Sequence, residues 1–536
     1  MKFICTDSLV KIFPETKTVR RFRKATALLQ DEFYLQLFML GNELKRDVVI
    51  VCSMPNAVTY YVEDFIAALN TTLPGADDYT VGKTGLYPDL LRPLSATDFF
   101  LRPNIASAAF VCIDCKKLGA GKHTLEFVLR CKEEVLACAV FSLYVVNDEY
   151  IENDLIVTNW LHCDCIADYY GYKPWTDAHF ESVFHFMSRA VANGINTVLV
   201  PCFTPPLDTQ VGSERTCVQL IGVEETEAGY EFDFSLLDRF VTLAEKAGVC
   251  YLEIGHLYSQ WGAQFCPNIY VCKNGKKYLK FGWHTDSEGE DYRTFLKTFL
   301  PLLNERLKFL GFDGRVIYHI SDEPNGQHLE RYKRHLSFLK EILPDSCVMD
   351  ALSEFKFHGI GIDLPVVSID ASDPFFAAKV PVMVYYCTGQ DRHYEPNSFF
   401  CTPSERNRVL GIMLYKSGAR GFLHWGYNFY NSYLSIRQID PFYETDSAGR
   451  YQAGDAFLVY PGKDGRPLDS LRLKVFSDAF RDYRALKLLE QKRGREFVIS
   501  MLEEKGFIGY FDYPHNAKAL LDLRDKINIE IGRSDN

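Results

Sequence analysis

The sequence lacks any long uninterrupted apolar run. Its first residues, MKFICTDSLVKIFPETK, contain no stretch typical of a secretion signal, and no window elsewhere approaches the length of a membrane span. An excess of positive charge is also missing, because 59 lysines and arginines face 70 aspartates and glutamates, a net charge of −11. Such a chain repels phosphate backbones and anionic lipid surfaces. We therefore expect a cytoplasmic protein that binds neither nucleic acid nor membranes.

A closed set of metal ligands is absent as well. The 16 cysteines are scattered through apolar runs, which favours buried reduced thiols over disulfides in a chain of this size. Cys112 and Cys115 form one C-x-x-C pair, and HCDC at 162–165 gathers four potential ligands, but neither has a second pair nearby in sequence. VGKTG at 81–85 has Asp77 where a phosphate loop needs its first glycine. The sequence therefore predicts no metal ion and no cofactor.

The residues that are present have the composition of an ordinary globular protein, with 47% hydrophobic and 24% charged residues. A chain of 536 residues exceeds what one hydrophobic core usually supports, so we expect two domains or one large barrel with an appendage. Residues 1–150 contain short β-rich runs, such as DVVIVCSM and HTLEFVLR, divided by turn residues. This pattern predicts an N-terminal β-sandwich domain.

Beyond residue 150 the pattern changes to short apolar strands that alternate with amphipathic helices. The candidate strands are 155–162, 196–201, 250–255, 315–320, 347–352, 365–369, 382–386 and 421–425. Clear helices follow the first four strands and the seventh, whereas those after the fifth and sixth are short. Eight such units predict an α/β fold with a (β/α)8 TIM barrel over residues 151–490. We expect residues 491–536 to form a helical extension packed on the barrel.

The segment YHISDEPNGQH, residues 318–328, ends the fourth candidate strand with an acidic pair, Asp322 and Glu323. Chemistry in a (β/α)8 barrel gathers where strands end, because those ends converge on one opening. The same dipeptide at 31–32 and 148–149 lacks this context. The alternative is a solvated strand end or a helix start, which proline and acidic residues favour. In a catalytic pair, burial and the neighbouring carboxylate would raise the pKa of a glutamate that must keep its proton.

Other polar and aromatic side chains also fall at the ends of candidate strands. They are His162, Asp164, His256, Tyr385, Tyr386, Trp425 and Asn428. Aromatic rings with carboxylates and amides around an apolar opening suit a sugar, whose faces stack while its hydroxyls take hydrogen bonds. Of only five tryptophans, four lie in or after barrel strands, at 160, 261, 283 and 425. The pattern predicts carbohydrate binding, and packing in the core remains the alternative for any single tryptophan.

With these residues in view, the chain resembles glycoside hydrolase family 123, together with the related group catalogued as domain of unknown function 4091. The segments that carry the resemblance are GLYPDLLRPL (85–94), TNWLHCDCIADYY (158–170), YHISDEPN (318–325), VYYCTGQDRHYEPNSFF (384–400), GFLHWGYNFYNS (421–432), and AGDAFLVYPGKDG followed by SLRLKVFSDAFRDYRAL. They occur in order over most of the chain. The resemblance implies a β-sandwich before a (β/α)8 barrel.

The characterised members of that family resemble β-N-acetylgalactosaminidases that retain configuration through the substrate's own 2-acetamido group. The resemblance implies that Asp322 orients and polarises this acetamide, while Glu323 protonates the leaving oxygen and then deprotonates water. An oxazolinium intermediate would replace an enzyme nucleophile. Tyr385, Tyr386 and Trp425 match positions where the family lines its sugar site. Since no secretion signal is seen, we expect a short imported glycoside as the substrate.

Two other functions stay open from the sequence. A glycosidase for sugars without an acetamido group would need a second carboxylate from another strand end, and Asp164, Asp350 and Asp370 are available. A non-catalytic carbohydrate-binding protein could also use this barrel, because fold does not fix function. The sequence gives no oligomeric state.

Overall fold

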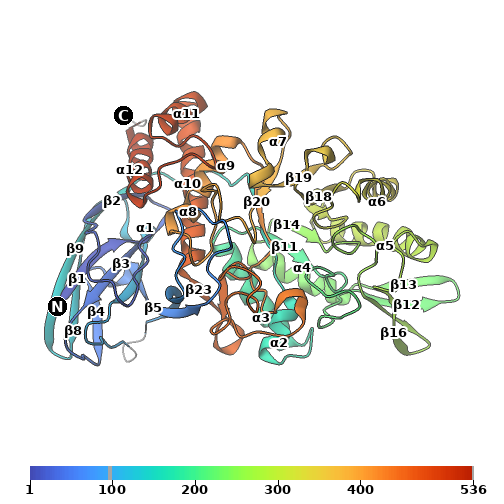
Figure 1. Ribbon diagram of the computed structural model, residues 1–536, viewed down its shortest axis with the longest axis horizontal. Coiled ribbons are helices and arrows are strands. Elements are labelled where there is room, and N and C mark those ends of the chain that lie inside the picture. The colour runs from blue at the N-terminus through green and yellow to red at the C-terminus, as the bar shows by residue number, and fades with distance from the viewer. Residues whose placement is uncertain (95–98, 534–536) are drawn as a thin grey trace.

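The computed structural model describes residues 1–94 and 99–533 and consists of a β-rich part beside a barrel (Figure 1). Within these residues, eight parallel strands pair in sequence order, and the last pairs with the first to close the barrel. The strands are β10 (Ile156–Asn159), β11 (Thr197–Val200), β14 (Tyr251–Ile254), β17 (Val316–Tyr318), β18 (Cys347–Leu352), β19 (Leu364–Ser368), β20 (Met383–Tyr385) and β21 (Gly421–His424). Each coincides with a predicted strand, so the (β/α)8 barrel is confirmed.

Side chains along each barrel strand alternate between two cores, as the period of a β-strand requires. Met383 and Tyr385 of β20 pack in the barrel interior. Val384 between them and Tyr386 after them pack in the layer between strands and helices. Because both faces are covered, the strands are short continuous apolar runs, which is the pattern that identified them in the sequence.

Helices cover the outside of the barrel. They are α2 (Cys163–Tyr170) and α3 (Asp177–Ala192) after β10, α4 (Ser235–Ala247) after β11, α5 (Glu290–Phe309) after β14, α6 (Leu329–Ile342) after β17, α8 (Ser404–Arg408) and α9 (Leu410–Ser417) after β20, and α10 (Leu471–Arg493) after β21. The fifth strand is followed by the 3-10 turn η2 (Phe355–Phe357), and the sixth by η3 (Ile369–Ala371) and α7 (Asp373–Ala377). The prediction of short fifth and sixth helices is confirmed.

The N-terminal part is a sandwich of two sheets. In the described part of the chain, one sheet has the order β1 (Lys2–Asp7), β3 (Glu32–Leu40), β7 (Ser107–Asp114), β5 (Val58–Ala68), β6 (Gly85–Pro93), β23 (Pro467–Ser470) and β22 (Val459–Pro461). The other has the order β2 (Lys24–Leu28), β9 (Glu134–Val146), β8 (Gly121–Cys131) and β4 (Val48–Cys52). Leu35 and Val111 of the first sheet share one core with Phe127 and Phe141 of the second. The predicted β-sandwich is confirmed.

Two strands of the first sheet come from far along the chain. β23 pairs antiparallel with β6, with Ser470 opposite Leu90. Just beyond it, Arg472 forms a buried ion pair with Asp89, with Nε and Oδ1 3.0 Å apart. The division into residues 1–150, 151–490 and 491–536 stays a prediction, and the shared sheet shows that the first two of these ranges are joined by hydrogen bonds across it.

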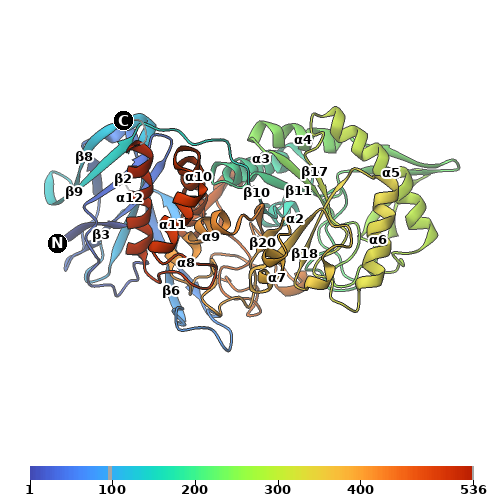
Figure 2. The same ribbon diagram turned by 90° about the horizontal axis from the view of Figure 1, so that it is seen from above.

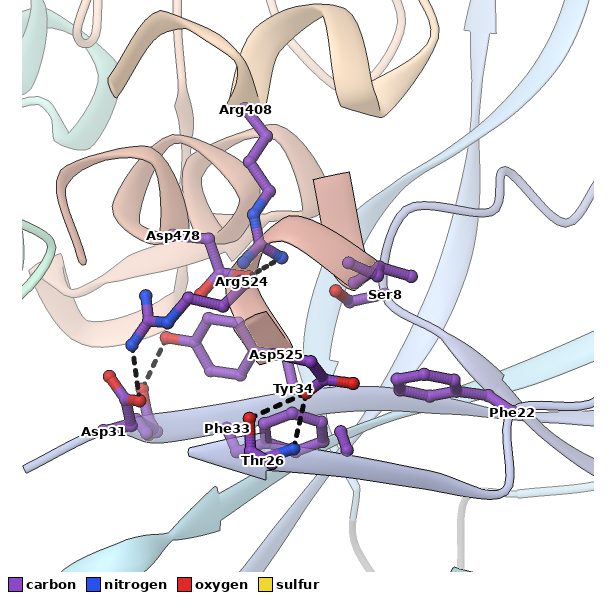
Figure 3. Close-up of a pocket in the computed structure, with 13 residues that line it drawn as sticks. Ser8, Phe22, Thr26, Asp31, Phe33, Tyr34, Arg408, Asp478, Arg524 and Asp525 are labelled. Atoms are coloured by element: carbon purple, nitrogen blue, oxygen red, sulfur yellow. Dashed lines mark hydrogen bonds and ion pairs between the residues drawn. The ribbon is translucent and has the colours of Figure 1, made fainter. Parts of the chain in front are cut away.

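The last two helices, α11 (Arg495–Glu504) and α12 (Ala517–Arg533), lie with α10 between the sandwich and the barrel (Figures 1 and 2). α12 packs against α10 on one side and against β2 and β9 on the other. Arg524 of α12 forms ion pairs with Asp31 at 2.7 Å and with Asp482 of α10 at 2.8 Å. Figure 3 shows Arg524 and Asp31 at this junction, with Arg408 beside Asp478. The C-terminal helices therefore contact both parts of the molecule.

The loops after β11 and β14 each contain a hairpin. β12 (Gly222–Thr226) pairs with β13 (Gly229–Asp233), β15 (Ile269–Lys273) pairs with β16 (Lys276–Phe281), and β12 pairs with β15. The two hairpins form one small sheet beside α5 (Figure 1). None of the helices within residues 1–94 and 99–533 combines the length and the apolar character needed to cross a bilayer.

Candidate active site

The acidic pair lies just beyond β17, at the C-terminal ends of the barrel strands, which we call the mouth. Asp322 and Glu323 are both half-buried. Glu323 has a φ of +41°, a left-handed conformation that is rare outside glycine and gathers at functional sites. The hydroxyl of Tyr385, the last residue of β20, donates a hydrogen bond to Glu323 Oε1 at 2.6 Å. This contact joins the ends of two strands that are three positions apart in the barrel.

The environment of Asp322 disfavours an unbalanced negative charge. Burial, followed by the charges of Glu323 and Asp208, raises the pKa of Asp322 well above its ordinary range, and the charge of His319 opposes the rise. A positive charge that forms beside Asp322 would therefore be strongly stabilised.

Two carboxylates that the sequence analysis did not select also lie at the mouth. Asp208, in the loop after β11, accepts a hydrogen bond from the hydroxyl of Tyr451 at 3.3 Å. Burial and the charges of Glu323 and Asp455 raise the pKa of Asp208 to about 6, against the charge of Arg215. Asp455 lies 3.3 Å from His424 Nε2 at the end of β21. Asp455 falls within the segment AGDAF, so that segment was the available signal, whereas Asp208 has no strand-end position to mark it.

His319, a buried and charged histidine, lies three residues before Asp322 in the chain. His319 contacts Glu253 through Nε2 at 2.6 Å and Asp350 through Nδ1 at 2.9 Å, and all three side chains are fully buried. Burial alone would lower the pKa of His319, but these hydrogen bonds outweigh it and raise the pKa to about 10. His319 is therefore an imidazolium at neutral pH.

The two carboxylates beside His319 are fully occupied. Glu253 also accepts hydrogen bonds from Thr158 Oγ1 at 2.5 Å and from Trp160 Nε1 at 2.6 Å. Asp350 accepts the backbone N–H of Ile320 at 3.1 Å and the hydroxyl of Tyr332. This network connects the ends of β10, β14, β17 and β18 and fixes the backbone two residues before Asp322. Asp350 thus has a supporting place beneath the mouth.

His256 stacks on His319, with ring centroids 4.2 Å apart. Burial and the charge of His319 lower the pKa of His256 well below its ordinary value, so it is neutral. Among the described residues neither of its nitrogens has a hydrogen-bond partner. The ligand atoms of His256, His319 and Asp350 lie within 4.8 Å of one another, but both ring nitrogens of His319 are already bonded to carboxylates.

Three more of the predicted residues are brought together, and their polar groups bind other protein groups. Asp164 forms a buried two-point ion pair with Arg215, at 2.7 and 2.8 Å. Arg215 also donates to His162 Nδ1 at 3.0 Å, and His162 Nε2 donates to the carbonyl of Trp425 at 2.9 Å. Asn428 exchanges two hydrogen bonds with the backbone of His162. These residues tie the end of β10 to the loop after β21. The cluster HCDC is thus part of a structural network in which Arg215, which the sequence analysis did not select, is central.

The two remaining aromatic candidates differ in position. Tyr386 is buried and packs on Phe422, with ring centroids 4.8 Å apart, in the layer beneath the helices. Trp425 is half-buried and packs edge-on against Tyr451 at 5.2 Å. Since the hydroxyl of Tyr451 contacts Asp208, Trp425 lies beside the carboxylates of the mouth. Tyr385 and Trp425 are therefore placed to contact a ligand there, whereas Tyr386 supports the barrel wall.

A closed parallel barrel with carboxylates and aromatic side chains at its C-terminal mouth is the arrangement of the barrel glycosidases. Comparison with known families identifies the particular group. The model of the glycoside hydrolase 123 catalytic domain matches residues 160–489. The chain therefore belongs to glycoside hydrolase family 123.

One solved structure supports the fold. A family 123 glycoside hydrolase from Clostridium perfringens, described for glycolipid glycan hydrolysis, aligns with a TM-score of 0.74 over 99% of this chain and 97% of its own, at 15% identity. A family 2 β-galacturonidase from Eisenbergiella tayi (TM-score 0.32, 10% identity, 84% of this chain and 69% of its own) is too distant to support an argument. The same holds for a family 5 mannosidase from Rhizomucor miehei (TM-score 0.33, 12% identity, 62% and 94%). A search of curated proteins found no match.

Proposed function

We propose that this glycoside hydrolase cleaves β-linked N-acetylhexosaminides, N-acetylgalactosaminides in particular, with retention of configuration and through the substrate's own acetamido group. The observation that carries the proposal is the placement of two carboxylates on consecutive residues of one strand end. An enzyme with its own nucleophile needs two carboxylates on opposite sides of the sugar, usually from different strand ends. Adjacent carboxylates instead suit two neighbouring groups of one substrate, the glycosidic oxygen and the acetamide.

In this mechanism Glu323 protonates the leaving oxygen, and the hydrogen bond from Tyr385 orients its carboxyl group. Asp322 accepts the acetamide N–H, so that the acetamide oxygen attacks the anomeric carbon. The bond to the leaving oxygen breaks, and an oxazolinium forms beside Asp322. Glu323, now ionised, takes a proton from the water that opens the ring. The positive intermediate forms beside a carboxylate that lies among the like charges of Glu323 and Asp208, which supports this assignment of roles.

A second candidate function is hydrolysis of sugars without an acetamido group. Of the carboxylates that the sequence offered for it, Asp164 is paired with Arg215 and Asp350 with His319. Asp370 is exposed and accepts a hydrogen bond from Ser368. Asp208 is the carboxylate that supports this second function, because the charges of Asp208 and Glu323 interact across the mouth.

A panel of aryl β-glycosides tests the two functions. We expect cleavage of the N-acetylgalactosaminide and at least 10³-fold lower kcat/KM for the galactoside, since the latter has no internal nucleophile. A thiazoline analogue of the bicyclic intermediate should inhibit far more strongly than the product sugar, and Asp322→Asn should remove most of that preference. Efficient cleavage of the galactoside that is lost in Asp208→Asn would instead establish the second candidate.

The glycan of a glycolipid, which the Clostridium perfringens relative is described as hydrolysing, is one source of such a substrate. A free oligosaccharide with the same terminal sugar is another. Assays with both, with and without detergent, separate them.

A further inference from the structure

The loop after β14 runs directly beside the acidic pair. Its backbone continues the pairing of β14 with β17 beyond the strand ends: Leu257 N–H donates to the carbonyl of His319 at 3.3 Å, and Tyr258 N–H to that of Ile320 at 3.1 Å. Further along, Ser321 Oγ donates to the carbonyl of Ser259 at 2.8 Å, and Trp261 N–H donates to the carbonyl of Asp322 at 3.2 Å. Trp261 is thus bonded through its backbone to the catalytic aspartate.

The backbone around Trp261 is held in an unusual conformation. Trp261, Gly262 and Ala263 all have positive φ angles, of 53°, 122° and 52°. Positive φ is unfavourable for a side chain as large as an indole, so the surroundings must impose it. Ala263 is buried, and its carbonyl accepts a hydrogen bond from Ser287 Oγ at 2.6 Å. On the other side, Gln260 Oε1 accepts the backbone N–H of Asp208 at 2.7 Å, which ties this loop to the loop after β11.

This rigid backbone carries an exposed ring. The side chain of Trp261 is 48% exposed, whereas Tyr258 and Ala263 on either side of it are 1% exposed. The described residues form no aromatic stacking with the indole. A large apolar surface left open at the rim of a mouth, on a strained and hydrogen-bonded turn, is not explained by packing.

We propose that Trp261 is the stacking platform of a leaving-group subsite, which takes the pyranose ring attached to the sugar that is cleaved. The inference rests on the proposed function. Trp425, Tyr451 and Tyr385 are half-buried or buried within the mouth and suit the terminal sugar. The leaving group must depart past Glu323. Glu323 directly follows Asp322, whose carbonyl accepts the backbone N–H of Trp261. An exposed indole there offers a flat apolar face to the C–H groups of a pyranose.

The platform predicts a dependence on the leaving group that can be measured with two substrates of the same terminal sugar. One carries a β-linked pyranose as the leaving group, as in an oligosaccharide, and the other carries fluoride, which is too small to reach the indole. Trp261→Ala should lower kcat/KM for the oligosaccharide about 10- to 50-fold and change that for the glycosyl fluoride less than twofold. Trp261→Phe should fall between. Inhibition by the thiazoline analogue, which has no leaving group, should stay within twofold of wild type.

The matched control is Phe309→Ala, which removes another exposed aromatic ring, 77% exposed at the end of α5 on the opposite face of the barrel. It should leave both substrates unchanged. Equal losses on both substrates in Trp261→Ala, or no loss on either, would overturn the platform and leave the proposed function standing. If wild type cleaves neither substrate, the proposed function fails. The platform is then judged by quenching of tryptophan fluorescence with β-linked disaccharides, and quenching that is undiminished in Trp261→Phe, or absent in wild type, overturns it.

Discussion

Asp322 and Glu323 are neighbours in sequence but have different surroundings. Glu323 accepts the hydroxyl of Tyr385 and has a strained backbone, which fixes the direction of its carboxyl group. Asp322 lies among other carboxylates, which raise its pKa, and the positive charge of His319 opposes that rise. The two residues can therefore be separated by experiment.

Glu323→Gln removes the proton donor, so glycosides with poor leaving groups should slow most, and an aryl glycoside with a good leaving group should lose much less in the first step. Asp322→Asn removes the charge that faces the oxazolinium, so both should slow, by about 10²- to 10³-fold. Single-turnover rates on an alkyl and a nitrophenyl glycoside make the comparison. Equal sensitivity of both variants to the leaving group would contradict the assigned roles.

His319 provides a prediction about pH. Its positive charge lowers the pKa of Asp322, so His319→Gln should raise that pKa further. Because the proposed mechanism uses Asp322 in its charged form, the acidic limb of the kcat/KM profile should move to higher pH, while the basic limb stays in place. His179→Gln, which alters a buried histidine of α3, is the control and should not move the profile. An unchanged acidic limb in folded His319→Gln would exclude this electrostatic role.

The sequence could place Asp322 and Glu323 at the mouth because the pair stands at a strand end in a barrel pattern. It could not identify Asp208 or Arg215, because both lie in a loop whose position depends on contacts with distant segments. For the same reason His162, Asp164 and Asn428 were predicted to bind substrate, and the structure shows their polar groups bound to one another and to Arg215. The fold determines which residues lie near the mouth, but it does not determine the hydrogen-bond partner of each side chain.

At the scale of a single strand, β5 contains a buried acid. Glu63 is 4% exposed, and within the described residues its two carboxyl oxygens have no hydrogen-bond partner. Burial, followed by the charge of Asp89, raises its pKa from 4.5 to about 8. A raised pKa means that the folded protein holds this proton more tightly. The contribution of protonated Glu63 to the free energy of unfolding is therefore fully present below about pH 4.5 and is lost as the pH rises through 8.

Glu63→Gln should remove this dependence. The variant should match wild type in free energy of unfolding at pH 5 and exceed it at pH 9. The gain should be on the order of 3–5 kcal/mol, since one pKa unit corresponds to about 1.4 kcal/mol. Urea denaturation at both pH values measures it. Glu134→Gln, at a side chain 64% exposed, serves as the control. Equal stability of Glu63→Gln and wild type at pH 9 would contradict the prediction.

The elements themselves were predictable to different degrees. The barrel strands are continuous apolar runs between helices, and this local pattern marks all eight. β22 and β23 are three and four residues long and belong to a sheet whose other strands end before residue 115. Nothing in their local sequence indicates that pairing, because it depends on where the long loop after β21 carries the chain. The pairing of short strands with distant partners could therefore not be predicted from the sequence.

Across the molecule, Arg524 of α12 connects the N-terminal sandwich to α10. Its guanidinium contacts Asp31 of the sandwich and Asp482 of α10, all three being nearly buried. Arg524→Leu leaves two buried carboxylates without this partner, so it should lower the free energy of unfolding by about 3–5 kcal/mol. Lys518→Ala on the same helix removes an exposed pair with Asp522 and should cost less than about 1 kcal/mol. Thermal denaturation of both variants tests this, and similar melting temperatures would show that the junction does not depend on Arg524.

The sheet shared between β6 and β23 also sets an order of events during synthesis. When the strands of the sandwich have left the ribosome, β6 still lacks its outer neighbour, and it stays an open edge until residue 470 has emerged. An open edge can pair with another chain. The free edge of β6 is therefore either exposed or covered by another protein while the barrel strands are translated. β23 can pair with β6 only after all eight barrel strands have been synthesised, so a fully paired sandwich sheet indicates that every strand of the barrel is present.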